Sequence, residues 1–492
     1  MPGPELNVLS EWLRSTAART PSAIAILEDE RATTFEDLLR RSLSLARCFV
    51  DAGLLPQERV VLVCRKSTDA IVALFASLFA GAIYVPLHPR WPKERIEETI
   101  RQCSARLVIT EQAGGLIIED RRNGTRLDPS AAPAASARPL PVLDPAAPAL
   151  ILFTSGSTGR CKGVILPHNA VAAFVQWSAE EFRISAADRI ACPSPLGFDL
   201  STFDIFNMAL RGATCVILPE NIVWMPRFLV QALRELRISC WYSVPSILSG
   251  MVQDGHLAEH RYPDLRLVLF AGEVFPAPGI SRLQTALPHT VLANLYGPTE
   301  TNVVTWAYVP DGFDGTSPIP IGHACPYARV MLDESTGELL AGGDSLMAGY
   351  WNNAEETERV FCSIGGELYY RTGDRATVCA GGSLLFLGRM DRQVKRRGFR
   401  IELGEIEEAL ARHETVLEAA AVAVGSYLVA FVTVRQGQIL SPAETKAHCA
   451  EILPSYMLPD RVIIREALPR GGRGKIDYIA LTGLAGELNR GD

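Results

Sequence analysis

The chain has 492 residues, of which 48% are hydrophobic and 21% charged, and its formal net charge at pH 7 is -7. A chain of this length exceeds one ordinary domain and predicts about three packing units, and the composition is that of a soluble globular protein. The acidic balance disfavours nucleic acid or an anionic membrane as a main partner, because both attract basic patches.

Cysteine usage and apolar runs indicate the compartment. The eleven cysteines are odd in number and none has Cys-x-x-Cys spacing. This disfavours a disulfide framework or a zinc site and favours a reducing cytoplasm. Met1–Glu11 lacks the pattern of a signal peptide. The apolar stretch Ala70–Leu87 is interrupted by Ser77, Gly81 and Pro86, so it predicts a buried helix running into a strand and not a membrane span.

The first part of the chain alternates helix and strand patterns. Val8–Arg19 and Thr34–Ala52 have helical periodicity, whereas Arg59–Cys64 and Arg106–Thr110 are short β-branched runs typical of strands. The alternation predicts a layered α/β domain with a largely parallel sheet. Residues 121–148, rich in Pro, Ala and Arg, predict an irregular surface connection.

Strand and helix patterns continue through the rest of the chain. Strands are predicted at Ala149–Phe153, Arg189–Cys192, Ala213–Leu218, Ser239–Ser243, Leu265–Phe270 and Val291–Leu295. Phe228–Leu236 is one of the helices between them, and the Gly-rich residues 321–387 lean towards β structure. After the charged patch Gly388–Arg400, a helix at Glu402–His413 and a strand at Val422–Val434 begin what is predicted to be a small separate domain.

A Gly- and hydroxyl-rich loop follows the strand at Ala149–Phe153. Residues 154–163 read Thr-Ser-Gly-Ser-Thr-Gly-Arg-Cys-Lys-Gly. The glycines free the backbone N–H groups to turn inward, the hydroxyls add donors and Lys162 adds charge, a combination that suits a polyphosphate. A polar surface turn is the alternative. The loop is not a Walker A motif, because Cys161 stands where its second glycine belongs, and it lacks Gly-x-Gly-x-x-Gly.

Further motifs accompany this loop. They are Thr33–Leu38, Ala80–Leu87, Asn294–Glu300, Tyr370–Asp374, Gly388–Lys395, Arg397–Glu407, Leu453–Pro459 and Gly474–Asp477. In content and order the set resembles the motifs of the adenylate-forming superfamily: acyl-CoA synthetases, luciferases and the adenylation domains of peptide synthetases. The peptide-synthetase type matches most closely, from residue 33 to residue 477.

The resemblance implies a fold and a reaction. The fold would be α/β, with a large N-terminal domain of layered α/β subdomains plus a β-barrel-like part, and a small mobile α+β C-terminal domain. Residues 1–388 would form the adenylation core with the ATP and amino-acid sites, 389–392 the hinge and 393–492 the lid domain. Such enzymes use ATP and Mg²⁺ to convert a carboxylate into an acyl-adenylate plus pyrophosphate, and then transfer the acyl group to a thiol.

The resemblance also assigns roles to residues. Lys475 would be catalytic, bridging the substrate carboxylate and the phosphoryl oxygen. The alternative interpretation is that it is a surface lysine without a catalytic role. Lys395 would serve the second, thiol-transfer conformation, Asp391 would be the hinge residue and Glu300 would hold Mg²⁺. The expected nucleotide-binding residues are Thr154, Ser155, Gly156, Ser157, Thr158, Gly159, Lys162, Asn294, Tyr296, Gly297, Thr299, Asp374 and Arg389.

Three of these residues have more specific expected roles. Asp374 would accept hydrogen bonds from both ribose hydroxyls, which suits the two oxygens of a carboxylate. Tyr296 would stack beside the adenine, and Arg389 would contact the ribose or a phosphate.

An aspartate marks the acyl substrate. A buried carboxylate in a substrate pocket needs a cation, and the α-ammonium group of an amino acid supplies one. Asp199 stands where the amino-acid-activating branch has such an aspartate, which ligases for plain fatty or aryl acids lack. Asp204 is a competitor, but it lies beyond the matching motif. The expected pocket is Phe198, Asp199, Leu200, Phe203, Tyr242, Leu269, Ala271, Leu295, Val303 and Val304, closed by Lys475.

Apart from Asp199, Lys475 and one phenol this lining is apolar, so it penalises charged or amide side chains and predicts a small or medium apolar amino acid. The set is similar to that of free-standing ligases that load L-proline onto a carrier protein. We therefore expect L-proline, with valine, isoleucine or pipecolate as alternatives.

One motif could mislead. Gly342–Leu346 mimics the phosphopantetheine attachment site of a carrier domain, with Ser345 as acceptor, but Ala348–Tyr350 continues directly as the sixth adenylation motif. Met331–Gly343 is shorter than the family pattern, so the alignment there is insecure. The chain ends soon after Lys475, so the expected thiol belongs to a separate phosphopantetheinylated carrier protein. A CoA ligase of the same fold, a luciferase-like oxygenase and a non-catalytic scaffold are the rival functions.

Overall fold

The computed structural model describes residues 7–112, 115–128, 138–156, 161–379, 381–472 and 475–490. The chain divides into two compact units. The first comprises Met1–Pro89, Ile100–Phe153 and Gly163–Met390, and the second Arg90–Thr99, Thr154–Lys162 and Asp391–Asp492. Each unit has its own hydrophobic core. Within the described ranges, no helix has the length and apolarity needed to cross a membrane.

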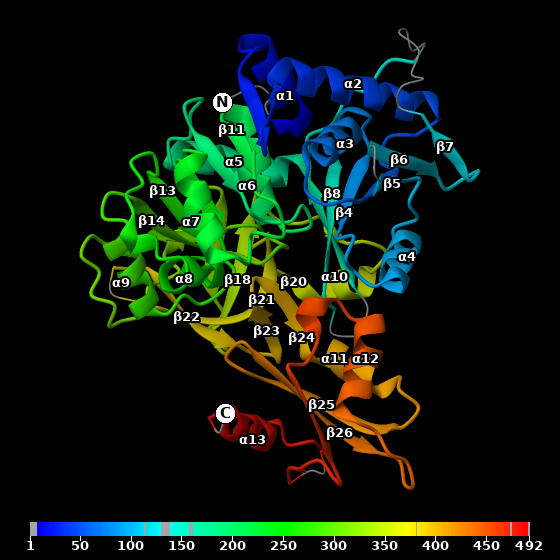
Figure 1. Ribbon diagram of the computed structural model, residues 1–492, viewed down its shortest axis with the longest axis vertical. Coiled ribbons are helices and arrows are strands. Elements are labelled where there is room, and N and C mark those ends of the chain that lie inside the picture. Colours follow the sequence, from blue (N-terminus) through cyan, green and yellow to red (C-terminus); the bar gives the residue numbers. More distant parts are fainter. Residues whose placement is uncertain are drawn as a thin grey trace. The chain divides into compact units, whose positions relative to one another are not determined.

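Two large sheets form most of the first unit (Figure 1). The nine-stranded sheet has the order β16 (His323–Ala324), β15 (Thr305–Tyr308), β14 (Val291–Tyr296), β13 (Leu267–Phe270), β12 (Cys240–Ser243), β10 (Arg189–Cys192), β11 (Thr214–Ile217), β1 (Ile24–Glu28) and β2 (Arg31–Thr34). The eight-stranded sheet has the order β19 (Gly349–Tyr350), β9 (Lys162–Pro167), β8 (Pro148–Thr154), β4 (Ile83–Leu87), β3 (Arg59–Val63), β5 (Leu107–Gln112), β6 (Gly115–Asp120) and β7 (Thr125–Leu127). Neighbouring strands pair in parallel from β1 to β14 in the first and from β8 to β5 in the second, as the alternating pattern predicted.

Helices cover these sheets and join them. They are α1 (Leu9–Arg19), α2 (Phe35–Asp51), α3 (Thr68–Phe79), α5 (His168–Glu181), α6 (Leu200–Arg211), α7 (Pro226–Glu235), α8 (Pro245–Gln253) and α9 (Ala277–Ala286). Helix α3 packs on β3 and β4, α6 packs on β10, β11 and β12, and α1 contacts both helices, so one helical layer is shared by the two sheets. Thr34 caps α2 by accepting a hydrogen bond from the Asp37 N–H at 3.2 Å, which ends β2 and starts the helix.

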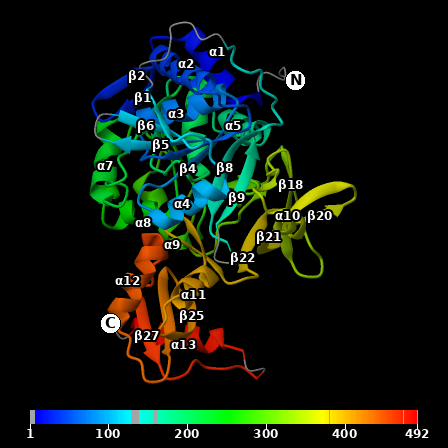
Figure 2. The same ribbon diagram turned by 90° about the vertical axis from the view of Figure 1, so that its right-hand side faces the viewer.

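A third, antiparallel sheet completes the first unit (Figure 2). Its strands are β17 (Ala328–Leu332), β18 (Glu338–Gly343), β20 (Phe361–Ile364), β21 (Glu367–Val378) and β22 (Leu384–Arg389), and α10 (Ala354–Val360) precedes β20. Strand β21 is central, because β18, β20 and β22 all pair with it. This curled sheet is the predicted β-barrel-like part, open rather than closed.

The second unit is a small α+β body. It contains the hairpin β23 (Gln393–Arg396) and β24 (Phe399–Glu402), the sheet of β25 (Val416–Val424), β26 (Tyr427–Val434) and β27 (Arg461–Arg465), and the helices α11 (Leu403–Ala411), α12 (Pro442–Ile452) and α13 (Tyr478–Arg490). Part of α4 (Lys93–Gln102) also belongs to it. The predicted fold class is thus confirmed in both parts.

Two local predictions were wrong. The run Val422–Val434 was predicted as one strand, but it spans the end of β25, a tight turn and β26. Gly425 has a φ of +61° and permits that turn, which the β-branched residues on both sides conceal in the sequence. Residues 121–148 were predicted to be irregular throughout, yet Thr125–Leu127 forms the edge strand β7 against β6.

A buried carboxylate fastens the amino ends of the parallel strands. Asp188 precedes β10 and accepts two hydrogen bonds from the Arg266 guanidinium, both at 2.8 Å, and one from the Ser239 hydroxyl at 2.8 Å. The backbone N–H of Ser185 donates to it at 2.8 Å. Burial raises the pKa of Asp188, but hydrogen bonds from Arg266, Ser239 and Ser185 outweigh burial and lower it to about 2.

We expect Asp188→Asn to destabilise the protein by about 2 kcal/mol at pH 7. The pKa of Asp188 in the folded state lies below its unfolded value of about 3.9. The stability that the ionised Asp188 contributes is therefore complete above about pH 3.9 and disappears as the pH falls towards 2. Urea unfolding of both proteins at pH 7 and pH 3 measures it. A difference between the two proteins that stays constant down to pH 3 would contradict the assignment.

Candidate functional site

The predicted amino-acid pocket lies at the carboxyl ends of neighbouring parallel strands. Tyr242 is in β12, Leu269 is opposite it in β13, and Ala271 directly follows β13. Leu295 is in the adjacent β14 and is 1% exposed. Open α/β sheets bind ligands at this end, because the loops there diverge and leave a crevice. The structure therefore brings these pocket residues together from separate motifs.

Helix α6 supplies a second wall. Its first residue, Leu200, and Phe203 are buried, and the ring of Phe203 contacts that of Tyr242 edge-on at 5.4 Å between centroids. Phe198 is partly buried just before the helix. Val303 and Val304 are buried after β14, where the Tyr327 hydroxyl donates to the Val303 carbonyl at 2.6 Å. The resulting surroundings are apolar and aromatic.

Asp199 is the charged group of this pocket. It is the N-cap residue of α6, and its side chain makes no capping hydrogen bond to that helix. The helix N-terminus favours a negative charge there. Burial, followed by the charge of Asp199, raises the pKa of the Tyr242 phenol, which places this acid near that ring.

The competing acid differs from Asp199 in its surroundings. Asp204 is fully buried, and neither of its carboxylate oxygens has a hydrogen-bond partner in the described part of the chain. Burial and the neighbouring Cys192 thiol raise the pKa of Asp204 well above that of an ordinary carboxyl, against an opposing effect of Lys66. Lys66 itself donates to the carbonyls of Cys192 and Ser194. These conditions favour a neutral Asp204.

Asp374, the predicted ribose-binding residue, forms a hydrogen-bonded cluster with two other predicted nucleotide-binding residues, Tyr296 and Arg389. The Tyr296 hydroxyl donates to one oxygen of Asp374 at 2.5 Å, and the Arg389 guanidinium donates to the other at 2.8 Å. Arg389 also donates to the Thr372 carbonyl at 2.7 Å. Burial and the Asp374 carboxylate raise the pKa of Tyr296, so its phenol remains a proton donor. Residues from β14, β21 and β22 thus converge on one buried carboxylate.

Two neighbouring predicted residues, Asn294 and Gly297, have structural roles of their own. The Asn294 side-chain amide donates to the Pro320 carbonyl at 2.9 Å. Gly297 is required for packing, because a Cβ there would lie 1.6 Å from the Asn302 carbonyl oxygen. Thr299 is partly buried in the same turn. The sequence could not show that Asn294 and Gly297 support the backbone around Tyr296.

Glu300, the predicted metal-binding residue, is 1% exposed and accepts a hydrogen bond from the Tyr350 hydroxyl at 2.7 Å. A carboxylate oxygen is the ligand that Mg²⁺ prefers. Where the chain is described, no three His, Cys, Asp or Glu side chains cluster as a metal site. A single carboxylate fits Mg²⁺ carried by nucleotide phosphates, since this ion is commonly held by one or two carboxylates together with phosphate oxygens.

Sequence reasoning missed two supporting residues. Tyr350 lies within the motif Ala348–Tyr350, but nothing in the sequence showed that its hydroxyl meets Glu300, fifty residues away. Glu338 lies in the segment Met331–Gly343, where the family alignment was insecure, and its carboxylate accepts the Gly373 N–H at 3.0 Å. The sequence gives no signal for this contact.

Part of the predicted phosphate loop is described, within the second unit. The Thr154 hydroxyl is buried and has no hydrogen-bond partner among the described residues, which leaves it available to a phosphate oxygen. The Ser155 hydroxyl donates to the Arg400 carbonyl at 2.5 Å. Gly156 follows it, and Lys162 begins β9. Ser157, Thr158 and Gly159 lie outside the described residues.

The remaining predicted residues are exposed in the second unit. Lys475 follows residue 472 after an undescribed pair, and its carbonyl accepts the Gly471 N–H at 2.8 Å. Lys395 is on β23, opposite Arg400 of β24. Asp391 is the first residue of the C-terminal segment of this unit, and its carboxylate accepts the Gln393 N–H at 3.1 Å. Their catalytic and hinge roles stay predictions.

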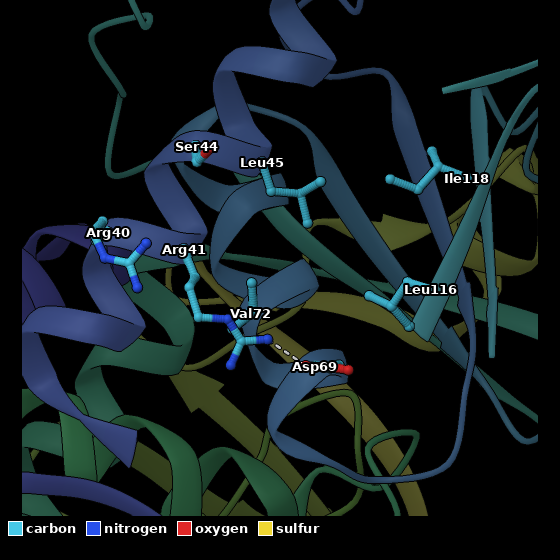
Figure 3. A pocket seen from close by; sticks show the side chains of 8 residues that line it. All are labelled: Arg40, Arg41, Ser44, Leu45, Asp69, Val72, Leu116 and Ile118. Carbon is cyan, nitrogen blue, oxygen red and sulfur yellow. Dashed lines mark hydrogen bonds and ion pairs between the residues drawn. The ribbon is translucent and has the colours of Figure 1, made fainter. Parts of the chain in front are cut away.

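A hollow of about 250 Å³ lies elsewhere in the first unit, between α2, α3 and β6 (Figure 3). Arg41 and Asp69 form an ion pair at its rim, and the apolar side chains of Leu45, Val72 and Ile118 line it. None of the predicted site residues borders it.

Known proteins are similar to this chain in sequence and in fold. Residues 13–351 match the AMP-binding enzyme family, and residues 405–475 match the AMP-binding enzyme C-terminal domain. An L-proline–[L-prolyl-carrier protein] ligase of Pseudomonas fluorescens is 36% identical, with 97% of this chain and 99% of that protein covered. A protein of the same name from Streptomyces coelicolor is 33% identical, over 94% and 96%.

The crystal structure of the Vibrio cholerae adenylation domain AlmE in complex with glycyl-adenosine-5′-phosphate superposes with a TM-score of 0.83 at 25% identity, over 99% of this chain and 98% of that one. The chain belongs to the AMP-binding enzyme family and is an ATP-dependent, AMP-forming ligase.

Proposed function

We propose that this ligase activates L-proline as prolyl-AMP and transfers the prolyl group to the phosphopantetheine thiol of a separate carrier protein. The observation that carries the proposal is Asp199, a carboxylate at a helix N-terminus beside the otherwise apolar wall of Phe203 and Tyr242. Such a carboxylate suits the ammonium group of an amino acid, and the apolar wall suits a ring of methylenes. The names of the two ligases described above support the same substrate and the same kind of partner.

The proposal gives each cluster one task. Asp199 holds the ammonium group, Asp374 and Arg389 hold the ribose of ATP, and Tyr296 lies beside the adenine. The buried Thr154 hydroxyl, Lys162 and the rest of residues 154–162 bind the phosphates. Mg²⁺, when bound, would neutralise phosphate charge, and Glu300 is the residue that would hold it.

The second unit supplies the remaining groups in this proposal. Lys475 joins the substrate carboxylate to the phosphoryl oxygen during adenylation, and Lys395 serves the thiol-transfer step after movement about Asp391. Residues 1–388 act as the core, 389–392 as the hinge and 393–492 as the lid. All eleven cysteines lie in the described residues and none forms a disulfide, which supports a reducing, cytoplasmic location.

Amino-acid-dependent ATP–pyrophosphate exchange tests this function. We expect proline to support exchange at least about tenfold faster than the other standard amino acids, because a fitted apolar pocket discriminates by about 10–200-fold per methylene. Valine, isoleucine and pipecolate are assayed alongside. Dominant exchange with one of them would replace proline, a product on free CoA would indicate a CoA ligase, and no exchange with any amino acid would contradict the proposal.

A further inference from the structure

The ribose-motif turn, residues 372–374, is a bulge in β21. On either side of it β18 pairs regularly with β21: Leu340 lies opposite Arg371, and Glu338 lies opposite Arg375. Between these two pairs β18 contributes one residue, whereas β21 contributes three. The extra residues interrupt the ladder between β18 and β21, while Asp374 still pairs with Arg389 of β22. Bulges of this kind re-aim side chains beside functional sites.

A single buried carboxylate, that of Glu338, accepts hydrogen bonds from two residues at the bulge. One oxygen of Glu338 accepts the backbone N–H of Gly373 at 3.0 Å, and the other accepts the Arg371 guanidinium at 3.0 Å. Glu338 is 7% exposed, so both of its oxygens depend on these donors. Gly373 has a φ of +69°, in the left-handed region that residues with side chains disfavour. Glu338 therefore stabilises the turn on its β18 side, where the ladder hydrogen bonds are interrupted.

The bulge determines where Asp374 points. The Thr372 hydroxyl donates to the Leu339 carbonyl at 2.6 Å and accepts the Asp374 N–H at 3.1 Å, which fixes the backbone on both sides of Gly373. The Asp374 carboxylate then meets Tyr296 and Arg389. Each carboxylate oxygen accepts about two hydrogen bonds, so Asp374 retains capacity for two ribose hydroxyls besides these partners.

We propose that Glu338 is a positioning residue for the nucleotide: by holding the bulge it aims Asp374 at the ribose hydroxyls and sets the preference for ribonucleotides over deoxynucleotides. This inference rests on the proposed role of Asp374 in ribose binding. Glu338 acts through Gly373 and has no contact with the reacting atoms in this scheme.

The test is Glu338→Gln, which preserves size but replaces one acceptor oxygen by an NH₂ donor. The NH₂ group of the new amide then points at one of the two donors, either the Gly373 N–H or the Arg371 guanidinium. Two donors cannot bond to each other, so one of the two hydrogen bonds is lost. Binding of AMP, 2′-deoxy-AMP and 3′-deoxy-AMP to the full-length protein is measured by calorimetry. We expect the wild type to prefer AMP by about tenfold or more, since each lost hydroxyl leaves a charged acceptor unpaired.

In Glu338→Gln, AMP should bind about tenfold more weakly while the deoxy analogues bind as they do to the wild type, so the ribose preference largely disappears. The matched control is Glu367→Gln, the same substitution in the neighbouring strand β21 of the same sheet, which removes an exposed ion pair with Arg329. It should keep the wild-type preference. A folded Glu338→Gln protein that also keeps the preference would overturn the inference.

Two further results separate the possible failures. A wild type without any ribose preference would refute the proposed role of Asp374 and this inference with it, whereas proline-dependent exchange could still be intact. If Glu338→Gln does not fold, Thr372→Val replaces it, because this change removes both hydrogen bonds of the Thr372 hydroxyl from the same bulge. An unchanged preference in that variant would equally overturn the inference.

Discussion

Replacing Lys475 by alanine is expected to slow proline-dependent ATP–pyrophosphate exchange by about 10²–10³-fold, the loss typical of removing one group that stabilises charge in a transition state. In the proposed reaction the attacking carboxylate and the α-phosphate both carry negative charge, so a lysine that contacts both is worth more as they approach than in the ground state. The variant should therefore lose kcat with little change in the KM for proline or ATP.

The same substitution should cost little stability. The Lys475 side chain is exposed, and the nearby backbone is held by the Gly471 N–H and by the bridge between Arg470 and Ile476. Arg412→Ala is the matched control, because it removes another exposed cation of the second unit, which forms an ion pair with Glu408 of α11. Its exchange rate should equal that of the wild type.

A second measurement distinguishes adenylation from transfer. Lys475→Ala supplied with synthetic prolyl-AMP should load a carrier protein at nearly the wild-type rate, since the proposal gives Lys475 no part in thiol attack. Wild-type exchange in the folded variant would remove Lys475 from the mechanism. Loss of both half-reactions would instead indicate a general defect of the second unit.

Sequence motifs identified residues that the structure brings together, but not the residues that hold their backbone in place. Tyr296, Asp374 and Arg389 come from three separate motifs, and the structure joins them through hydrogen bonds of 2.5 and 2.8 Å. Glu338 could not be found in this way. Its contact with Gly373 depends on two extra residues in β21, and a change of register leaves no mark in local composition.

Local patterns predicted elements well where their boundaries carry chemical signals. Thr34 ends one strand and caps the next helix, and the predicted helix at Thr34–Ala52 is α2 within one residue at each end. The hairpin of β25 and β26 failed the same test, because Gly425 is a weak signal inside a run of β-branched and small residues. In both places, the residues at the element boundary determined whether that boundary could be predicted from the sequence.

The second large loss of activity is expected when Asp199, the proposed partner of the substrate ammonium group, is replaced. Asp199→Asn should lower kcat/KM for proline by about 10²–10³-fold, because removing one member of a buried charge pair costs about 2–5 kcal/mol. The loss should appear mainly in the KM for proline, with the KM for ATP unchanged. Tetrahydrofuran-2-carboxylate, in which oxygen replaces the ammonium nitrogen, should lose much less, so the preference for proline over this analogue shrinks.

Asp204→Asn provides the discriminating control, since the sequence alone left two acids five residues apart as candidates. Asp204 is fully buried, its oxygens lack partners among the described residues, and its raised pKa favours the neutral acid. Replacing a neutral carboxyl by a neutral amide of the same size changes no charge, so proline-dependent exchange should stay near the wild-type rate. If Asp204→Asn loses exchange and Asp199→Asn retains it, the ammonium partner is Asp204. The pocket would then have to be rebuilt around the interior face of α6 instead of its N-terminus.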